Sequence, residues 1–288
     1  MPFFPEPLTG LQKACLKQLS ITLHADTICL WLNFFCLTSD PLKIQYQQKE
    51  SNTTVLCKKK NFQAFMEDTD FVTVLQEDLT IILEESEPEL QELHIGFQES
   101  EEQIDRVFAS IEDLLKPRKD KLKVKNINLE IRNSEQLTSV LQYLDSENLK
   151  TVDLKLKGIV DLRNLLELDA WKEKNGLEMN VALDTFLVMD LEALKENLIQ
   201  QPTFDTVTIY YDRIHQDAFE SLHHNHQPLG ISHYPHSHKI SFSRVHLISP
   251  NVIQQAIPYP STSNSVSGVI GNYVIIRNIL KYVGGVDM

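Results

Sequence analysis

Three short segments share one pattern that decides the fold: KVKNINLEI (residues 123–131), LKTVDLKL (149–156) and FDTVTIYY (204–211). Each contains a six-residue phrase with apolar residues at its first, fourth and sixth positions, and amphipathic, helix-like runs separate the phrases. The fourth position recurs at intervals of 25, 27 and 28 residues, at Ile127, Val152, Met179 and Val207. These intervals are typical of proteins built from strand-plus-helix repeats. The sequence therefore predicts an α/β fold with parallel strands and right-handed crossovers.

The repeat departs from the common leucine-rich pattern at one position. Leucine-rich repeats carry Asn or Cys three residues after the sixth position of this phrase. The five corresponding positions here hold Gln98, Arg132, Lys157, Asp184 and Asp212. We therefore predict an irregular, leucine-rich-repeat-like solenoid without a buried asparagine ladder.

The rest of the chain divides by its hydrophobic periodicity. Residues 1–20 contain a two-turn helical pattern, LQKACLKQL, which is too short to be stable alone. Alternating apolar residues at 21–60 predict a small antiparallel β region. The solenoid is expected over 61–250, starting with a helix at 62–85, and 251–288 form a divergent tail.

Composition narrows the class of protein. The 288-residue chain has a formal net charge of −13, which argues against a nucleic-acid partner. Its most apolar window, residues 28–37, is far shorter than the roughly 20 residues of a membrane span, so we expect no membrane partner. No secretory signal is evident, and the four cysteines lack zinc-ligand spacing. We expect an intracellular protein, cytoplasmic or nuclear, with reduced thiols.

The order of these segments resembles the FTH domain, a large nematode family of F-box-associated domains. The resemblance covers roughly residues 21–245. It rests on four segments: LQEDLTIILEESEPELQELHI (75–95), ELDAWK (167–172), DLEALKENLIQQPTF (190–204) and YPHS (234–237).

Members of this family usually begin with an F-box, a helical module that binds the Skp adaptor of a cullin-type ubiquitin ligase. Here only residues 1–20 precede the FTH-like part, and LQKACLKQL resembles the end of an F-box. The resemblance implies a protein-interaction module that recruits substrate proteins to a ligase, with a missing or truncated F-box. The alternative is a ligase-independent decoy or scaffold that lacks the Skp contact.

A partner-binding surface follows from the strand pattern. Successive side chains of a strand point to opposite faces, so the residues between the apolar ones should line an exposed sheet face. We predict that an unidentified protein partner binds this face through nine residues: Asn126, Asn128, Glu130, Thr151, Asp153, Lys155, Thr206, Thr208 and Tyr210. Trp171 is either a core residue or an interface anchor.

No enzyme motif is present. The sequence contains no phosphate-binding loop, nucleophile elbow or HExxH zinc motif, so we expect no catalytic residue, no cofactor and no enzymatic activity. The metal-site candidate is a histidine-rich loop that contains neither Cys nor carboxylate ligands, and we expect it to be solvated. A metal-binding protein remains a third alternative, with ligands from His223, His226, His236 and His238.

Overall fold

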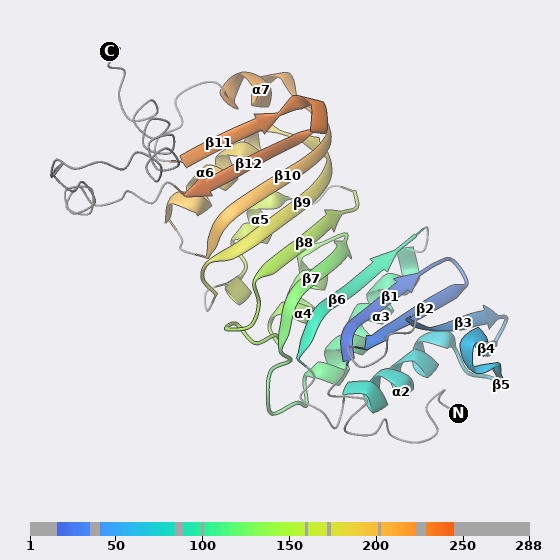
Figure 1. Cartoon of the computed structure of the whole chain (residues 1–288). Coiled ribbons are helices and arrows are strands. Elements are labelled where there is room, and N and C mark those ends of the chain that lie inside the picture. Colours follow the sequence, from blue (N-terminus) through green and yellow to red (C-terminus); the bar gives the residue numbers. More distant parts are fainter. Residues whose placement is uncertain are drawn as a thin grey trace, which may run out of the picture. The chain divides into compact units, whose positions relative to one another are not determined.

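The computed structural model shows a mixed α/β architecture in which helices pack on one β-sheet (Figure 1). All described residues belong to one compact unit, Met1–Val245. The structure describes residues 16–34, 41–83, 89–98, 101–158, 161–171, 174–200, 203–222 and 229–244.

The strands of the sheet are β1 (Leu16–Leu23), β2 (Thr27–Phe34), β3 (Leu42–Lys49), β4 (Asn52–Cys57), β5 (Phe62–Met66), β6 (Leu90–Phe97), β7 (Val124–Ile131), β8 (Thr151–Leu156), β9 (Leu177–Phe186), β10 (Phe204–Ile214), β11 (Leu229–Tyr234) and β12 (Lys239–Arg244). The α-helices of the described part are α2 (Phe71–Leu83), α3 (Glu101–Leu115), α4 (Ser134–Leu141), α5 (Leu162–Leu166), α6 (Val188–Gln200) and α7 (Gln216–Leu222). Among the described residues there are also three short 3₁₀ turns: η1 (Lys58–Lys60), η2 (Asp169–Trp171) and η3 (Pro235–Ser237).

The sheet has a parallel centre and antiparallel ends. Its twelve strands lie in the order β11-β12-β10-β9-β8-β7-β6-β1-β2-β3-β4-β5. Strands β6 to β10 are parallel and adjacent in chain order, and β1 adds a further parallel strand beside β6. Strands β2 to β5 pair antiparallel at one end, as do β12 and β11 at the other.

One side of this sheet is largely apolar. The strands pair in a register that places one aliphatic residue beside the next, and side-chain burial alternates clearly along β7 and β8. The clearest level crosses nine strands with side chains no more than 3% exposed: Ile240, Ile209, Val181, Leu154, Leu129, Ile95, Ile21, Leu30 and Ile44.

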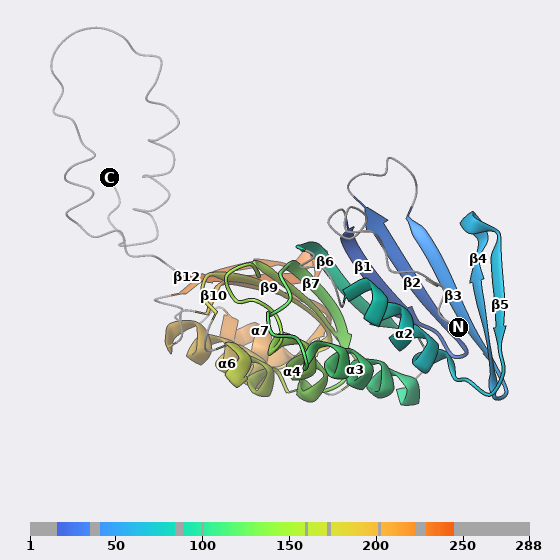
Figure 2. The same ribbon diagram turned by 90° about the horizontal axis from the view of Figure 1, so that it is seen from below.

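The described helices cover this apolar side as a single layer (Figure 2). Helices α2 and α3, α3 and α4, α5 and α6, and α6 and α7 are neighbours in this layer. In α3 the buried residues follow the expected three- and four-residue spacing, at Ile104, Val107, Phe108, Ile111 and Leu115. The buried residues of α4 follow a similar spacing. Asn133 caps the N-terminus of α4: its side chain accepts a hydrogen bond from the Gln136 N–H at 2.9 Å.

The predicted α/β class is confirmed, including the parallel strands at all three recurring phrases. The finer prediction of a leucine-rich-repeat-like solenoid is not confirmed. The strand–helix units are part of a twelve-stranded open sheet whose two ends are antiparallel. The sequence around Phe242 follows the repeat phrase, yet β12 runs antiparallel to β10 because a β11–β12 hairpin places it there.

Two predicted helical segments are strands. Residues 16–19, the second half of LQKACLKQL, lie in β1 between β2 and β6, and the first half lies outside the described residues. Residues 62–66 form the edge strand β5, so the helix expected from 62 begins only at Phe71. Residues 16–19 pair with the distant strand β6, and residues 62–66 pair with the neighbouring strand β4. In both cases strand pairing outweighs a short helical pattern, because a helix of about two turns is marginally stable by itself. The antiparallel region predicted at 21–60 is observed, although it is continuous with the main sheet rather than separate. The tail at 251–288 lies outside the described residues.

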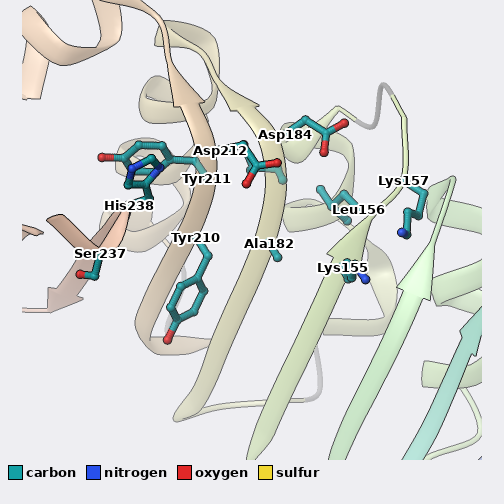
Figure 3. A pocket seen from close by; sticks show the side chains of 11 residues that line it. Lys155, Leu156, Lys157, Ala182, Asp184, Tyr210, Tyr211, Asp212, Ser237 and His238 are labelled. Carbon is teal, nitrogen blue, oxygen red and sulfur yellow. The ribbon is translucent and has the colours of Figure 1, made fainter. Parts of the chain in front are cut away.

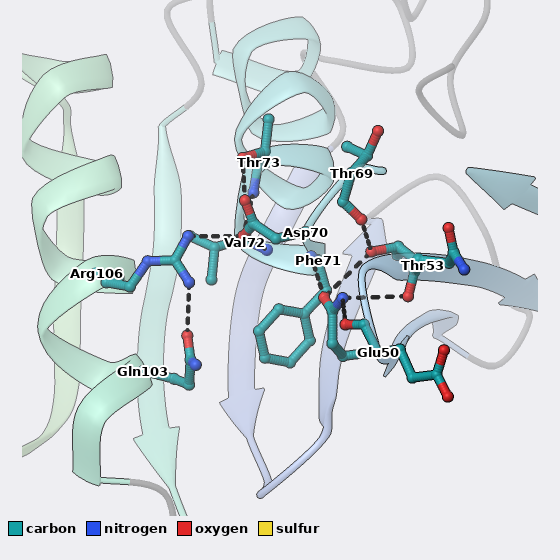
Figure 4. A network of polar contacts seen from close by, with 11 residues as sticks. Glu50, Thr53, Thr69, Asp70, Phe71, Val72, Thr73, Gln103 and Arg106 are labelled. Atoms are coloured by element: carbon teal, nitrogen blue, oxygen red, sulfur yellow. Dashed lines mark hydrogen bonds and ion pairs between the residues drawn. The ribbon is translucent and has the colours of Figure 1, made fainter. Parts of the chain in front are cut away.

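Polar contacts attach the start of α2 to its surroundings (Figure 4). Asp70 accepts hydrogen bonds from the backbone N–H groups of Val72 and Thr73, which caps the helix, and pairs with Arg106 of α3 at 2.8 Å. Burial alone would raise the pKa of the Asp70 carboxyl, but the Thr73 hydroxyl and the Arg106 guanidinium outweigh burial and hold that pKa below its usual value. Gln48 accepts a hydrogen bond from the Phe71 N–H at 2.8 Å, so the β3–β4 hairpin also contacts this helix end.

A buried polar pair joins the same helix to the sheet. The Tyr46 hydroxyl of β3 donates a 2.7 Å hydrogen bond to the Asp78 carboxylate of α2, and both residues are fully buried. Burial first, and the Asp78 charge second, raise the pKa of Tyr46 well above its ordinary value. The hydrogen bond satisfies two groups that would be costly to bury alone.

Trp171 is a core residue, which decides between its two interpretations. Its side chain is fully buried, its indole N–H donates a 2.6 Å hydrogen bond to the Leu165 carbonyl, and its ring meets Phe204 edge-on at 5.2 Å. The residue therefore fills the space between η2 and β10 and is not available as an interface anchor.

Replacing Trp171 should test this packing. We expect Trp171→Ala to lower the free energy of unfolding by about 3–5 kcal/mol, because it leaves a large cavity and an unpaired carbonyl. The matched control is Trp31→Ala, since Trp31 is 36% exposed and mainly contacts the Lys43 ammonium. That control should cost less than about 1 kcal/mol. Urea unfolding followed by far-ultraviolet circular dichroism measures both, and equal costs would contradict the core assignment.

Candidate functional site

The sheet face opposite the helices is polar, and in the described part of the chain no helix covers it (Figure 2). We call the outward-facing residues of β6 to β10 the open face. Its middle level runs beside the buried aliphatic level, one residue out of phase with it. It is formed by His94, Asn128, Asp153, Asn180 and Thr208.

The nine predicted site residues all lie on the open face, in two groups. Asn126 pairs with Thr151, Asn128 with Asp153 and Glu130 with Lys155, across β7 and β8. The other three stand one above the next on β10 at Thr206, Thr208 and Tyr210. Strand β9 separates the two groups and contributes Glu178, Asn180 and Ala182 at the same three levels.

The sequence analysis missed four residues of the open face, which the alternation of side chains along a strand could have predicted. Glu92 and His94 of β6 occupy the levels of Asn126 and Asn128, and Glu178 and Asn180 of β9 occupy those of Thr151 and Asp153. The same alternation rule, applied to the phrase at 90–95 and to the weaker strand at 177–181, gives these residues. Only the pairing shows that they form one continuous surface.

Accessibility differs among the predicted residues. Tyr210 is 40% exposed and Lys155 is exposed, whereas Thr208 is only 5% exposed. The Thr208 hydroxyl lies 3.1 Å from the Ser241 hydroxyl of β12, in hydrogen-bonding contact. Thr208 therefore stabilises the strand pair and offers little surface to a partner, which corrects its place among the contact residues.

Side chains of the open face bond to one another across strands. The Asn180 amide donates a 2.6 Å hydrogen bond to the Asp153 carboxylate. Glu130 accepts from the Lys155 ammonium at 2.7 Å and from the Phe97 N–H at 2.9 Å. These contacts fix rotamers before any ligand arrives, which lowers the entropy cost of binding.

Glu130 is the most strongly held charge of this network. Burial alone would raise the pKa of its carboxyl, but the hydrogen bonds from Lys155 and from the Phe97 N–H outweigh burial and lower the pKa below its usual value. The same contact with Glu130 raises the pKa of Lys155. Both groups are therefore charged at neutral pH.

Gly96 leaves space for His94. A Cβ at Gly96 would lie 2.9 Å from the His94 Nε2 atom and 3.6 Å from the Glu130 carboxyl carbon. A side chain at this position would therefore force the His94 imidazole to move. Gly96 brings the imidazole and the carboxylate close to the same position on the open face.

A hollow of about 330 Å³ lies at the carboxyl ends of β8, β9 and β10 (Figure 3). We call it the carboxyl-end hollow. It is lined by Lys155, Leu156, Lys157, Ala182, Leu183, Asp184, Tyr210, Tyr211, Asp212, Ser237 and His238. The carboxyl ends of parallel strands are where ligands commonly bind in α/β sheets.

The hollow exists because a small residue stands between two large ones. Lys155, Ala182 and Tyr210 occupy one level of β8, β9 and β10. Neighbouring strands are about 4.8 Å apart, so the backbones that carry Lys155 and Tyr210 are separated by roughly 10 Å. Only the methyl group of Ala182 lies between these two side chains.

Charged residues surround the upper rim of the hollow. Lys157, Asp184 and Asp212 occupy the positions where a leucine-rich repeat would carry its asparagine ladder. The departure noted in the sequence therefore places charges at one end of the open face. No sequence pattern indicated that these three would share a hollow.

Aromatic residues, Tyr210, Tyr211 and His238, line the side of the hollow formed by β10 and the residues after η3. The Tyr211 ring stacks on His238 at 5.7 Å, and its hydroxyl lies 2.7 Å from the His233 Nε2 atom. Burial raises the pKa of Tyr211. The Lys239 ammonium lies 5.5 Å from the centroid of the Tyr210 ring, a cation–π distance.

The histidine-rich loop is only partly described. His223 and His226 lie outside the described residues, while His236 lies in η3 and His238 follows it. Among the residues that the structure describes, no group of three or more His, Cys, Asp or Glu could hold a metal ion. Cys29 and Cys57 are free and buried. Within the described ranges, no helix is both long and apolar enough to cross a membrane.

Residues 105–182 match the family model of the FTH domain, from α3 through β7, β8 and most of β9. This segment thus resembles the FTH domain, which belongs to an F-box-associated family, and the match confirms over these residues the resemblance seen in the sequence. No curated protein matches the chain significantly.

The Glu130–Lys155 pair can be tested by titration. We expect Lys155→Gln to raise the pKa of Glu130, because it removes the nearest cation and one hydrogen bond. The pKa of Glu130 is lower in the folded state than in the unfolded state. The pair therefore stabilises the fold fully above the unfolded-state pKa of about 4.3, and this stabilisation is lost as the pH falls through the folded-state pKa. Carboxyl carbon NMR measures the pKa, with Lys43→Gln, at the far antiparallel end, as the control. An unchanged Glu130 pKa in Lys155→Gln would mean that the Phe97 N–H and the Lys157 charge set it without Lys155.

Proposed function

We propose that this protein is an interaction module that holds another protein on its open face. In this proposal the FTH domain recruits substrate proteins, as the binding domain of an F-box protein does in a cullin-type ubiquitin ligase. The observation that carries the proposal is the polar sheet face left uncovered by the described helices, opposite a largely apolar, helix-covered face. The strand–helix units of β6 to β10 would act as repeats that extend this surface.

The shape and chemistry of the face support binding. Its side chains project from paired strands, so a partner meets a rigid surface. Cross-strand contacts such as Asn180 with Asp153 hold side chains in place, while Tyr210 and Lys155 extend into solvent. Tyrosine is among the residues that dominate interface energetics.

We propose binding rather than catalysis for this protein. The acidic and basic groups that meet on the open face neutralise each other, as Glu130 and Lys155 do at 2.7 Å. Such pairing leaves a charged surface for recognition instead of a base of tuned pKa. The proposed setting is the intracellular space, which suits the free, buried thiols of Cys29 and Cys57.

Removing side chains from the open face should abolish partner capture. We expect Asn126→Ala, Asn128→Ala and Thr151→Ala combined to weaken a captured protein's binding by at least about tenfold, because they lie at the centre of the face. The control combines Gln142→Ala and Gln216→Ala, which are exposed on the helix side. Captured proteins are identified by crosslinking mass spectrometry, and their affinities are then measured with purified components. If the triple variant kept every partner at full affinity, the open face would not be the binding surface.

One observation favours the second candidate, a ligase-independent decoy or scaffold. Residues 16–19, which resemble the end of an F-box helix, are strand β1 and pair with β2 and β6. Those residues cannot serve at once as a helix for an adaptor.

Co-purification with the Skp adaptor separates the two candidates. If the chain recruits substrates to a ligase, it should form a one-to-one complex with the adaptor on size-exclusion chromatography. A stoichiometric complex would exclude the decoy. If the two proteins elute separately while open-face partners still bind, the ligase role fails and the decoy is supported. The matched sample is the open-face triple variant, whose adaptor binding should be unchanged.

A further inference from the structure

We propose that the carboxyl-end hollow binds the guanidinium group of an arginine side chain presented by a protein partner. The inference rests on the proposed function and deepens it, because it assigns a chemistry to one end of the open face. It depends on three features of the hollow: two adjacent carboxylates, an exposed aromatic ring and a slot of the right width.

The carboxylates are adjacent and have no partner within the described structure. Asp184 lies two residues beyond Ala182 on β9, and Asp212 lies two residues beyond Tyr210 on β10. Since Ala182 and Tyr210 are paired, the two aspartates share a level on neighbouring parallel strands. Like charges side by side destabilise a strand pair, and a bound cation would remove that repulsion. Both residues are exposed, so an incoming group can reach them.

The aromatic wall favours a flat cation. Tyr210 is 40% exposed and its ring stands beside Ala182, with nothing larger than a methyl group at the base of the slot (Figure 3). The ring already attracts the Lys239 ammonium, whose Nζ lies 5.5 Å from its centroid. A guanidinium can stack on such a ring while its N–H groups reach carboxylates in a fork, which an ammonium cannot do.

The two lysines of the hollow affect a ligand differently. Lys155 is paired with Glu130 at 2.7 Å, so its charge is largely compensated. Lys157 also lines the hollow, and it would repel a bound cation but attract a bound anion. Removing Lys157 therefore changes affinity in opposite directions for the two kinds of ligand.

A peptide titration tests the proposal on the full chain. The probe is acetyl-Gly-Arg-Gly-amide, and its comparison peptides carry citrulline or glutamate in place of arginine. Amide shifts in the nuclear magnetic resonance spectrum should respond at Ala182 and Tyr210 with a dissociation constant on the order of millimolar, as a single side chain allows. The citrulline peptide, which keeps the shape but lacks the charge, should bind about tenfold more weakly.

Four variants sharpen the result. Asp184→Asn with Asp212→Asn should weaken the arginine peptide about tenfold or more, since it removes both charge-assisted acceptors. Ala182→Leu should block binding by filling the slot without altering charge. Lys157→Gln should strengthen binding about two- to threefold. Gln142→Ala, on the helix side, should leave binding unchanged. The aspartate variant keeps the test decisive if Ala182→Leu fails to fold, because both aspartates are exposed.

Three outcomes would overturn the inference. They are equal binding of the citrulline peptide, preference for the glutamate peptide with loss in Lys157→Gln, and unchanged binding in the double aspartate variant. None of them bears on the triple variant at Asn126, Asn128 and Thr151, which tests the open face as a whole. If that triple variant loses partners while the arginine peptide fails to bind, only the assignment of the hollow is wrong.

Discussion

The structure depends on the alternation of side chains in a sheet covered by helices on one side only. Every described strand of the centre places one set of side chains under the helices and the other set on the open face. The strands pair at matching levels, so Ile95, Leu129, Leu154 and Val181 meet beneath the helices and His94, Asn128, Asp153 and Asn180 meet on the opposite side. A slip of one residue would exchange the two sets, which makes the register strongly specified. The binding surface is therefore a consequence of the core.

The antiparallel ends belong to the same core. Strand β1 pairs parallel with β6 and antiparallel with β2, so it joins the N-terminal strands to the strand–helix units. Helix α2 is attached to these strands by the buried Tyr46–Asp78 hydrogen bond and to α3 by the Asp70–Arg106 pair. The aliphatic level continues across β1, β2 and β3, ending at Ile44. The sheet thus extends well beyond the repeats that predict it.

The two parts of the open face differ in what their side chains do. In the middle, amide and carboxylate groups hydrogen-bond to one another, as Asn180 does to Asp153, so the surface is polar and its side chains are held in place. At the carboxyl end, Ala182 interrupts a row of large side chains, and Asp184 and Asp212 rise beyond it. A partner would be held broadly by the first part and selected by the second, because a hollow with specific charges discriminates between side chains more strongly than a flat surface does.

The sequence by itself determined the parallel centre of the fold and most of the open face. Apolar spacing within each phrase and the intervals between phrases predict β7, β8 and β10. Those features depend on periodicity and on contacts between near neighbours, which a sequence carries directly. Only the tertiary structure decided that residues 16–19 and 62–66 are strands, because pairing with β6 and with β4, respectively, selects between two short, weak patterns. It also decided that Trp171 and Thr208 are buried, because elements from other parts of the chain pack against them. The carboxyl-end hollow has the same origin: the sequence contains Lys155, Ala182 and Tyr210 as separate residues, and strand register alone places them side by side.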